Sequence, residues 1–425
     1  MAKRNDAQTS SMLKVVGYTL LIVATVAGAW ALAVTLRDGH YYSATTQFVP
    51  WGLWVALYIF FLGLSAGSFL LSTLVYVFGV KRLEAVGPMA LVQALGCLIL
   101  GGILILLDLG HPFRVYKVLA GFNVTSVMAW MGLFYNLYIL VILLELYLAL
   151  RPTFVDMVRR GQGPVGLYRT LTFGYEDISE AALARDRRWL RILGTLGIPI
   201  AVIVHGGVGT IFAVAKARPT WFGGAFPILF LLSALASGGA LLTLLTAAFV
   251  KLPRDRRQEI VVSLSRLTVG ILAFELLFLF AEVLTSLYGD IPHEAGAWRI
   301  TLFGPFWWVF WIFQLGLGAI VPILIVAHPR TGRRVGWLAA AGALIVIGMV
   351  AARLSIVVPN QVIPPFEAMV GAYNGPRFSL GYFPSAHEWL VGLGVAALGV
   401  WMFIAVEKLL PVVTKPLEAV PEGGN

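Results

Sequence analysis

Apolar runs long enough to cross a lipid bilayer recur along the whole 425-residue chain. A helix needs about 20 apolar residues to cross the ~30 Å hydrocarbon layer. Ten such runs are expected, near residues 13–36, 51–79, 87–108, 125–149, 190–214, 225–250, 258–288, 305–327, 335–357 and 386–411. The backbone must satisfy its own hydrogen bonds in lipid, and these runs do not alternate as barrel strands do. The sequence therefore predicts an all-α, polytopic membrane protein with about ten transmembrane helices.

The composition supports this fold class and limits the chemistry of the chain. Only 12% of residues are charged, whereas soluble domains have about a quarter. The single cysteine, Cys97, excludes a disulfide, a zinc knuckle or an iron–sulfur cluster held by this chain alone. No C-x-x-C-H motif is present for covalent haem. We therefore expect no metal site of these kinds, no iron–sulfur cluster and no covalently bound haem in this chain.

Basic residues in the predicted loops indicate the orientation in the membrane. Most of them fall on one side, in the N-terminal segment, the loops at 81–82, 151–191, 251–257 and 330–334, and the C-terminal tail. The positive-inside rule predicts that this side, with both termini, is cytoplasmic. The net charge of +10 thus reflects topology and membrane lipid, and no nucleic-acid partner is expected. The N-terminal segment shows no small-residue cleavage site, so the first run is expected to be an uncleaved helix.

A faint internal repeat suggests how the helices are grouped. Residues 64–74 (LSAGSFLLSTL) and 235–245 (LASGGALLTLL) match at five of eleven positions. The two segments also enter the membrane from the same side. Two parallel four-helix bundles are therefore predicted, from spans 2–5 and 6–9, flanked by spans 1 and 10. The corresponding domains are 1–50, 51–214, 225–357 and 358–425, the last of which starts with a Pro-, Gly- and aromatic-rich outer loop that we expect to be a partner surface.

Titratable residues gather in the outer half of the first predicted bundle. Charged side chains in hydrocarbon cost at least ~2.5–3.5 kcal/mol, so each is a candidate functional residue. Asp108, His111 and Arg114 lie where the third run ends, and His205 lies roughly 13 Å inside the fifth at ~1.5 Å per residue. Aromatic walls would come from Trp54, Tyr58 and Tyr135. Imidazoles that exchange protons near neutral pH, inside such walls, suit an amphipathic ring with two carbonyl oxygens, which describes a quinone.

Further ionisable residues fall in the second predicted bundle. Glu275 and Glu282 share one face of the seventh run at i, i+7. Arg266 lies nine residues before Glu275, on the inner part of the same run. Arg353 lies near the outer end of the ninth run and is expected to reach a carboxylate such as Glu282.

Several of these segments resemble the NrfD/PsrC family of integral membrane, quinone-interacting subunits. The resemblance is carried by PWGLWVALYIFFLGLSAG (50–67), DLGHPFRVYKVL (108–119), NVTSVMAW (123–130), His205 with FPILFLLSALASGGAL (226–241), and Glu275 in FELLF. It covers roughly residues 13–411. The ten-helix count resembles the longer branch, which includes hydrogenase-2-type, DsrP-like and alternative complex III subunits.

The resemblance implies a respiratory complex subunit in a bacterial or archaeal cytoplasmic membrane. Such a subunit binds menaquinone or ubiquinone near the outer face. It has no haem, no iron–sulfur cluster and no other redox centre of its own. An iron–sulfur or cytochrome subunit docks on the outer side, with a further catalytic subunit. By position, Asp108 and His205 would contact or protonate the quinone, while His111 and Arg114 line its mouth. A second-bundle proton path would be formed by Glu275, Glu282, Arg266 and Arg353.

Three other functions are open at this stage. A secondary transporter would use the repeat, although its ionisable groups should lie at the midplane. A b-type cytochrome would need paired histidines such as His111 and His205, although bis-histidine ligands usually lie well inside a span. A structural membrane anchor without quinone chemistry of its own is the third.

Overall fold

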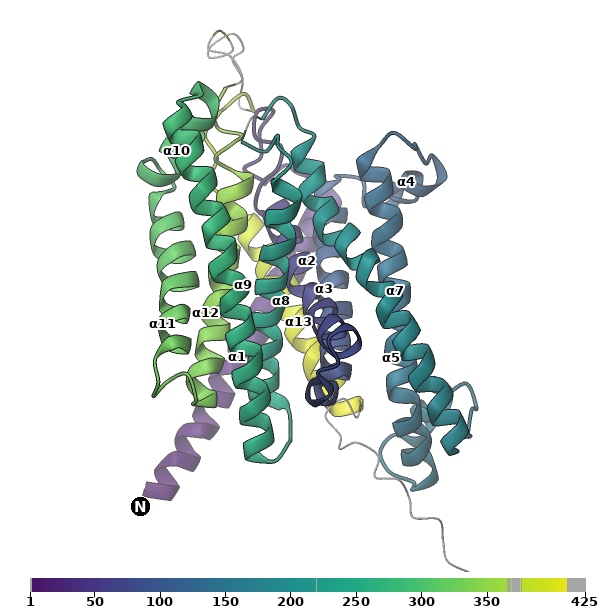
Figure 1. Cartoon of the computed structure of the whole chain (residues 1–425). Coiled ribbons are helices and arrows are strands. Elements are labelled where there is room, and N and C mark those ends of the chain that lie inside the picture. Colours follow the sequence, from purple (N-terminus) through teal and green to yellow (C-terminus); the bar gives the residue numbers. More distant parts are fainter. Residues whose placement is uncertain (1, 219, 365–367, 369–374, 376, 411–425) are drawn as a thin grey trace, which may run out of the picture.

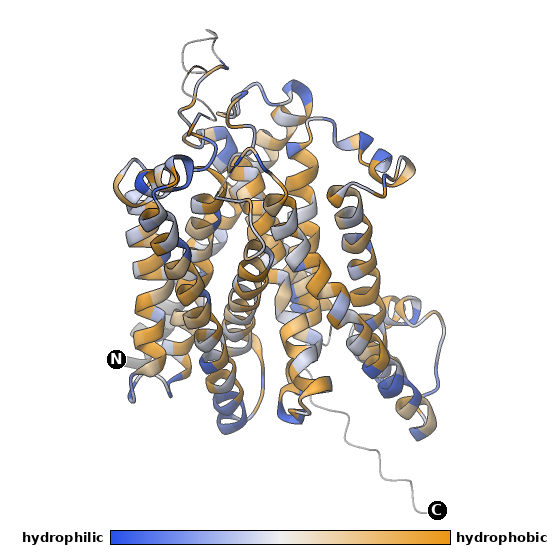
Figure 2. Ribbon diagram, turned by 45° about the horizontal axis from the view of Figure 1, so that its top comes forward, coloured by the Kyte–Doolittle hydropathy of each residue, from blue (hydrophilic) through white to orange (hydrophobic). Residues whose placement is uncertain are grey.

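The computed structural model describes residues 2–218, 220–364, 368, 375 and 377–410. These residues form helices and loops without any strand. Ten of the helices are long and apolar enough to cross a membrane. Figure 2 shows their apolar middle parts side by side, with hydrophilic residues gathered toward the ends. The all-α fold class and the ten predicted spans are therefore confirmed.

The spans follow the predicted runs closely, and several are built from two consecutive helical segments. The first five are α1 (Ala2–Asp38), α2 (Leu53–Ser72) continued by η1 (Thr73–Val77), η2 (Lys81–Val86) continued by α3 (Gly87–Asp108), α5 (Val127–Arg159) and α7 (Glu180–Ala213). The second five are α8 (Phe226–Phe249), α9 (Arg254–Gly289), η4 (Val309–Ile320) continued by α11 (Val321–Ala327), α12 (Val335–Val357) and α13 (Ala386–Leu409). Short helices in the connections are η3 (Pro112–Arg114), α4 (Tyr116–Ala120), α6 (Val165–Leu171) and α10 (Pro292–Phe303).

Helix α2 lies at the centre of the molecule. Of its most apolar stretch, 94% is buried inside the protein. It packs against α3, α7, α8 and α12, and Figure 1 shows it surrounded by the other spans. A helix that is apolar on all sides belongs in such an interior position. The residues of the PWG-to-SAG segment are therefore placed where several spans meet.

The contact between α2 and α8 is made by the two repeated segments themselves. Gly67 and Gly238 occupy the same position of the repeat, and their backbones are in direct contact. Gln93 of α3 reinforces the crossing, because its Nε2 donates to the carbonyl oxygens of Leu64 (2.8 Å) and Gly238 (2.9 Å). Small residues at a helix crossing let two backbones approach closely. The repeat thus marks the crossing of α2 with α8.

Helices α1 and α13 form a separate pair. They pack against each other at Gly28 and Gly394, and α13 also contacts α2 and α3. In Figure 1, α1 starts and α13 ends on the face where the basic loops lie, which we call the basic face. We call the opposite face the outer face. The division into two bundles and four domains stays a prediction, and residues 365–367, 369–374, 376 and 411–425 of the last domain lie outside the described part.

Candidate functional site

A tight turn at the outer end of α3 shapes the predicted DLGHP segment. Asp108 ends the helix, and Gly110 has φ +70°, a conformation that suits glycine. A Cβ at Gly110 would lie 3.5 Å from the ring of His40. The exposed side chains of His111 and Arg114 then line a cavity of about 190 Å³ between this turn and the end of α1.

The buried ring of Trp54 lies close to two histidines. The ring centroids of Trp54 and His40 are 5.4 Å apart, and those of Trp54 and His387 are 6.5 Å apart. The Nε1 of Trp54 donates to the carbonyl oxygen of Glu388 (3.3 Å). His387 Nε2 is also 2.9 Å from Thr35 Oγ1 on α1. These contacts bring α1, α2 and α13 together around Trp54, which the sequence predicts to form part of an aromatic wall.

A phenol–carboxylate pair lies beside this ring. Tyr382 Oη donates to Glu388 Oε1 (2.7 Å) and accepts from the backbone N–H of Leu53 (2.7 Å). Burial and the adjacent Glu388 carboxylate raise the pKa of the Tyr382 phenol above its usual value. Asp108 interacts electrostatically with both residues. We call the group formed by His40, Trp54, Asp108, Tyr382, His387 and Glu388 the outer cluster.

The sequence predicts only two members of the outer cluster, Trp54 and Asp108, as site residues. Glu388 is a common residue at a helix start, and it forms a capping box with Ser385 at the N-terminus of α13. Its Oε2 also accepts from the backbone N–H of Ala44 (3.0 Å), a contact between distant parts of the chain. The only sequence signal was the run of Tyr382, His387 and Glu388 near one predicted membrane boundary.

The two predicted tyrosines lie deeper than Trp54. Tyr58 is buried one turn further along α2. Tyr135 of α5 donates to the carbonyl oxygen of Leu98 and lies against Gly101 and Gly102 of α3. Both phenols therefore face the interior between α2, α3 and α5, below the outer cluster.

His205 lies in a separate place, deeper in the membrane. Its ring stacks on Phe69 (centroids 6.5 Å apart) and meets Tyr138 edge-on (5.8 Å). Neither ring nitrogen has a hydrogen-bond partner within the described part of the chain. Phe69 lies about 24 Å along α2 from Leu53, at ~1.5 Å per residue, whereas the outer cluster is level with Leu53. The structure therefore does not bring His205 and Asp108 together, nor His205 and His111.

Glu275 and Glu282 line one small cavity of about 50 Å³ between α9, α10, η4 and α12. Five polar atoms of its lining residues are buried without a partner among the described residues: Thr220 Oγ1, Glu275 Oε2, Trp298 Nε1, Gln314 Oε1 and Ser355 Oγ. Unpaired buried polar groups in a space of this size are typical of sites that hold water. The two predicted carboxylates thus share a polar cavity.

The two predicted arginines of this path differ in position. Arg353 is buried between α2, α8 and α12, with its guanidinium 5.3 Å from the Phe230 ring centroid. Its guanidinium interacts electrostatically with Glu275, whereas the sequence predicts an interaction with Glu282. Helical side chains tilt toward the helix N-terminus, which for α12 lies at the basic face, so Arg353 reaches the glutamate that is nearer to that face. Arg266 is exposed on the basic face and lines a surface pocket with Arg82. It lies about 13 Å along α9 from Glu275, so the structure does not bring it into the cavity.

Within the described ranges, no group of three or more His, Cys, Asp or Glu side chains could hold a metal ion. Cys97 is free and buried in α3.

Residues 41–365 match the family model described as "Polysulphide reductase, NrfD". This match spans most of the chain and includes the turn at Asp108, the two repeated segments, and Glu275 and Glu282 of α9. The chain belongs to the NrfD family. The resemblance stated from the sequence is therefore confirmed.

Relatives in this family are similar over nearly their full length. The chain is 38% identical to a selenate reductase subunit of Mesobacillus selenatarsenatis, over 96% of both chains. It is 30% identical to a putative dimethyl sulfoxide reductase membrane subunit of Halobacterium salinarum, over 93% of this chain and 90% of that protein. It is 26% identical to an Hdr-like menaquinol oxidoreductase integral membrane subunit of Archaeoglobus fulgidus, over 95% of this chain and 94% of that protein.

These NrfD relatives are named as subunits of reductases and of a menaquinol oxidoreductase. Together with the ten apolar helices, they support a general role as a multi-pass membrane subunit of an oxidoreductase complex with partner subunits. They are also consistent with interaction with a quinone.

Proposed function

We propose that this NrfD protein binds a quinone or quinol in the outer cluster and exchanges electrons with a redox subunit docked on the outer face. The observation that carries this proposal is the outer cluster itself. Two imidazoles lie against the Trp54 ring, and Asp108 interacts with the adjacent Tyr382–Glu388 pair, next to a cavity that His111 and Arg114 line. Burial of so many ionisable groups at one membrane boundary has a cost that a purely structural anchor would not need.

The cluster offers suitable groups for a ring that bears two oxygens. Glu388 and Tyr382 are held by hydrogen bonds to each other and to the backbone. Asp108 has no hydrogen bond to any described residue, so its carboxyl group is available to a ligand. Asp108 and His111 would accept the protons of a quinol, or supply protons to a quinone. A relative named as a menaquinol oxidoreductase subunit favours menaquinone over ubiquinone.

The electrons would pass to or from an iron–sulfur or cytochrome subunit. The outer segments 44–50, 214–218, 220–225 and 358–364 are suited to hold such a subunit because Arg218 joins parts of them by hydrogen bonds. Its guanidinium donates to the carbonyl oxygens of Phe48 (3.1 Å), Asn360 (3.0 Å) and Ile363 (3.1 Å). Burial lowers the pKa of Arg218. These joined segments would form an ordered surface on which the redox subunit docks, and a further catalytic subunit would bind to that redox subunit.

Proton movement is proposed through the cavity of the second half of the chain. Glu275 and Glu282 line it, Arg353 interacts with Glu275, and unpaired polar atoms would bind water. Water and carboxyl groups in such a cavity can pass protons over short distances. The basic loops favour a cytoplasmic location of both termini, in a bacterial or archaeal cytoplasmic membrane.

Binding of a naphthoquinone inhibitor to the purified complex tests the quinone site. Trp54 lies in the cluster, so a bound quinone should quench tryptophan fluorescence. We expect saturable quenching, and an affinity about 10-fold weaker in Asp108→Asn, because a hydrogen bond to a charged group contributes ~1.5–3 kcal/mol. Asp255→Asn, exposed at the start of α9, is the matched control and should bind like the wild type. Absence of saturable binding to the wild-type protein would leave an anchor or a transporter as the better explanation.

A further inference from the structure

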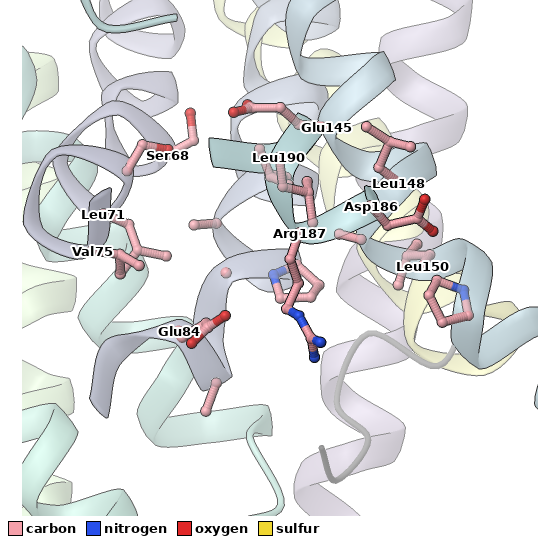
Figure 3. Close-up of a pocket in the computed structure, with 18 of the residues that line it drawn as sticks. Ser68, Leu71, Val75, Glu84, Glu145, Leu148, Leu150, Asp186, Arg187 and Leu190 are labelled. Carbon is pink, nitrogen blue, oxygen red and sulfur yellow. The ribbon is translucent and has the colours of Figure 1, made fainter. Parts of the chain in front are cut away.

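A second cavity, of about 400 Å³, lies toward the basic face between η1, the η2–α3 connection, α5 and α7. Figure 3 shows Glu84 and Arg187 at one end of this cavity and Ser68 with Glu145 at the other. The titratable groups that line it, besides Glu145, are Lys81, Glu84, Asp186, Arg187 and Arg256. Because Lys81, Glu84, Arg187 and Arg256 are exposed, this end is open to water, and the cavity leads from there into the membrane region.

Glu145 lies at the end of the cavity that is farthest from the basic face. Its side chain is only 5% exposed, yet it has no hydrogen bond or ion pair to any residue that the structure describes. Asp186, in the same cavity, is different because it is paired with Arg151. A buried carboxyl group without a partner is costly unless it faces water or carries a proton. Glu145 therefore has the position of a group that takes protons from the cavity water.

Beyond Glu145, a pair of hydroxyl groups leads to His205. Ser68 lines the cavity, and its Oγ is 3.1 Å from Tyr138 Oη. The ring of Tyr138 in turn contacts that of His205, whose two nitrogens are buried without a partner in the described part of the chain. Tyr138 and Glu145 are seven residues apart on α5, so they share one face, and they interact electrostatically.

We propose that this cavity is a proton inlet from the basic face to His205, through Glu145, Ser68 and Tyr138. Glu145 takes a proton from cavity water and releases it toward Ser68. Each hydroxyl oxygen then accepts one proton and gives up another, and a His205 ring nitrogen accepts the last. The net change is one proton moved from the solvent to His205, because Glu145 and both hydroxyl groups return to their starting states, and the reverse sequence returns the proton. The inlet rests on the proposed function, because the quinone reaction would supply the demand for protons, and it gives the deep His205 a role apart from the outer cluster.

Accessibility of position 145 tests the cavity without any quinone chemistry. Glu145→Cys, in a Cys97→Ala background, is treated with a membrane-impermeant thiol reagent in vesicles of either orientation. Lys251→Cys marks the basic face, and Phe113→Cys, 86% exposed in the wild type, marks the outer face. We expect Glu145→Cys to react from the side of Lys251→Cys alone. Reaction from the side of Phe113→Cys, or none from either side, would overturn the inlet.

Turnover of the whole complex tests the relay. Glu145→Gln keeps the shape of the side chain but cannot take up a proton, and we expect it to slow quinone-linked electron transfer about 10-fold or more. Its solvent deuterium isotope effect should rise while quinone affinity stays unchanged. Glu145→Asp should restore part of the rate, and Glu180→Gln, exposed on the basic face outside the cavity, is the matched control.

The two proposals fail in different ways. Wild-type rate and isotope effect in Glu145→Gln, with normal quinone binding, would refute the inlet alone. Absence of quinone binding in the wild-type complex would refute the proposed function, while the accessibility of position 145 would still report on the cavity.

Discussion

Replacement of Gly238 by alanine tests the crossing of α2 with α8, on which the placement of both halves depends. The added Cβ would overlap the backbone of Gly67 and lie 2.8 Å from the carbonyl carbon of Ala66. Backbone atoms cannot rotate away, so the two helices must separate. Overpacking of this kind costs ~1–3 kcal/mol, and alanine returns ~0.5–1 kcal/mol through its higher helix propensity. We expect a net loss of up to about 2 kcal/mol in the free energy of unfolding.

The assay is reversible unfolding in mixed micelles, followed by circular dichroism. Gly270→Ala in α9 is the matched control, because a Cβ there would meet no atom within 4 Å, and we expect it to be neutral or slightly stabilising. Gly67→Ala and Gly238→Ala together should cost less than the sum of the two single changes, since one separation of the helices relieves both overlaps. Equal stability of Gly238→Ala and Gly270→Ala would refute the close crossing.

Three further perturbations have clear expected outcomes. Arg353→Ala removes the buried guanidinium that interacts electrostatically with Glu275 and should destabilise the protein by ~1–3 kcal/mol, because a buried charged group then loses a favourable interaction. Arg353→Ala combined with Glu275→Gln should recover much of this loss in unfolding measurements. Gly110→Ala forces a side chain into φ +70° and should weaken naphthoquinone binding through a local cost of ~1–2 kcal/mol, without a change in helix content by circular dichroism. The raised pKa of Tyr382 means that the unfolded chain loses this proton first as pH rises, so stability should fall above about pH 10, and less so in Tyr382→Phe, as judged by melting temperatures at pH 8 to 11.

The spans were predictable because the free energy of transfer into lipid depends on each segment alone. The run predicted at 335–357 has the same first and last residues as α12. The basic-face ends of α5 and α7 were not predictable in this way. These helices continue to Arg159 and from Glu180, beyond the apolar runs, and a buried ion pair between Arg151 and Asp186 joins them. Hydropathy detects the membrane but not a polar helical extension held by a partner distant in sequence.

The candidate site was predictable only in part, for a related reason. Asp108 and Trp54 stand out in the sequence because each lies in a short local motif, at 108–119 and 50–67. Glu388 and Tyr382 reach them through contacts that join positions more than 300 residues apart. The roles of Asp108 and His205 remain predictions, and their separation in depth follows from helix packing, which composition and spacing do not specify.

The basis for a transport role is weaker in the structure than that for a quinone site. The ionisable groups of the outer cluster lie at one boundary, and those of the α9 cavity and of the Glu145 cavity lie elsewhere. Three separate polar regions, each with a carboxyl group that has no ion-pair partner in the described chain, are more suitable for proton exchange at different depths than for one alternating substrate site.

Photochemical crosslinking of an azido-naphthoquinone to the intact complex tests the placement of the quinone site most directly. Labelled peptides would be identified by mass spectrometry, with and without an excess of a menaquinone analogue. We expect the competed label within residues 36–54, 107–114 or 382–390, which surround Trp54 and Asp108. Competed label confined to α9 and α10 around Glu282, or no competed label at all, would contradict a quinone site in the outer cluster.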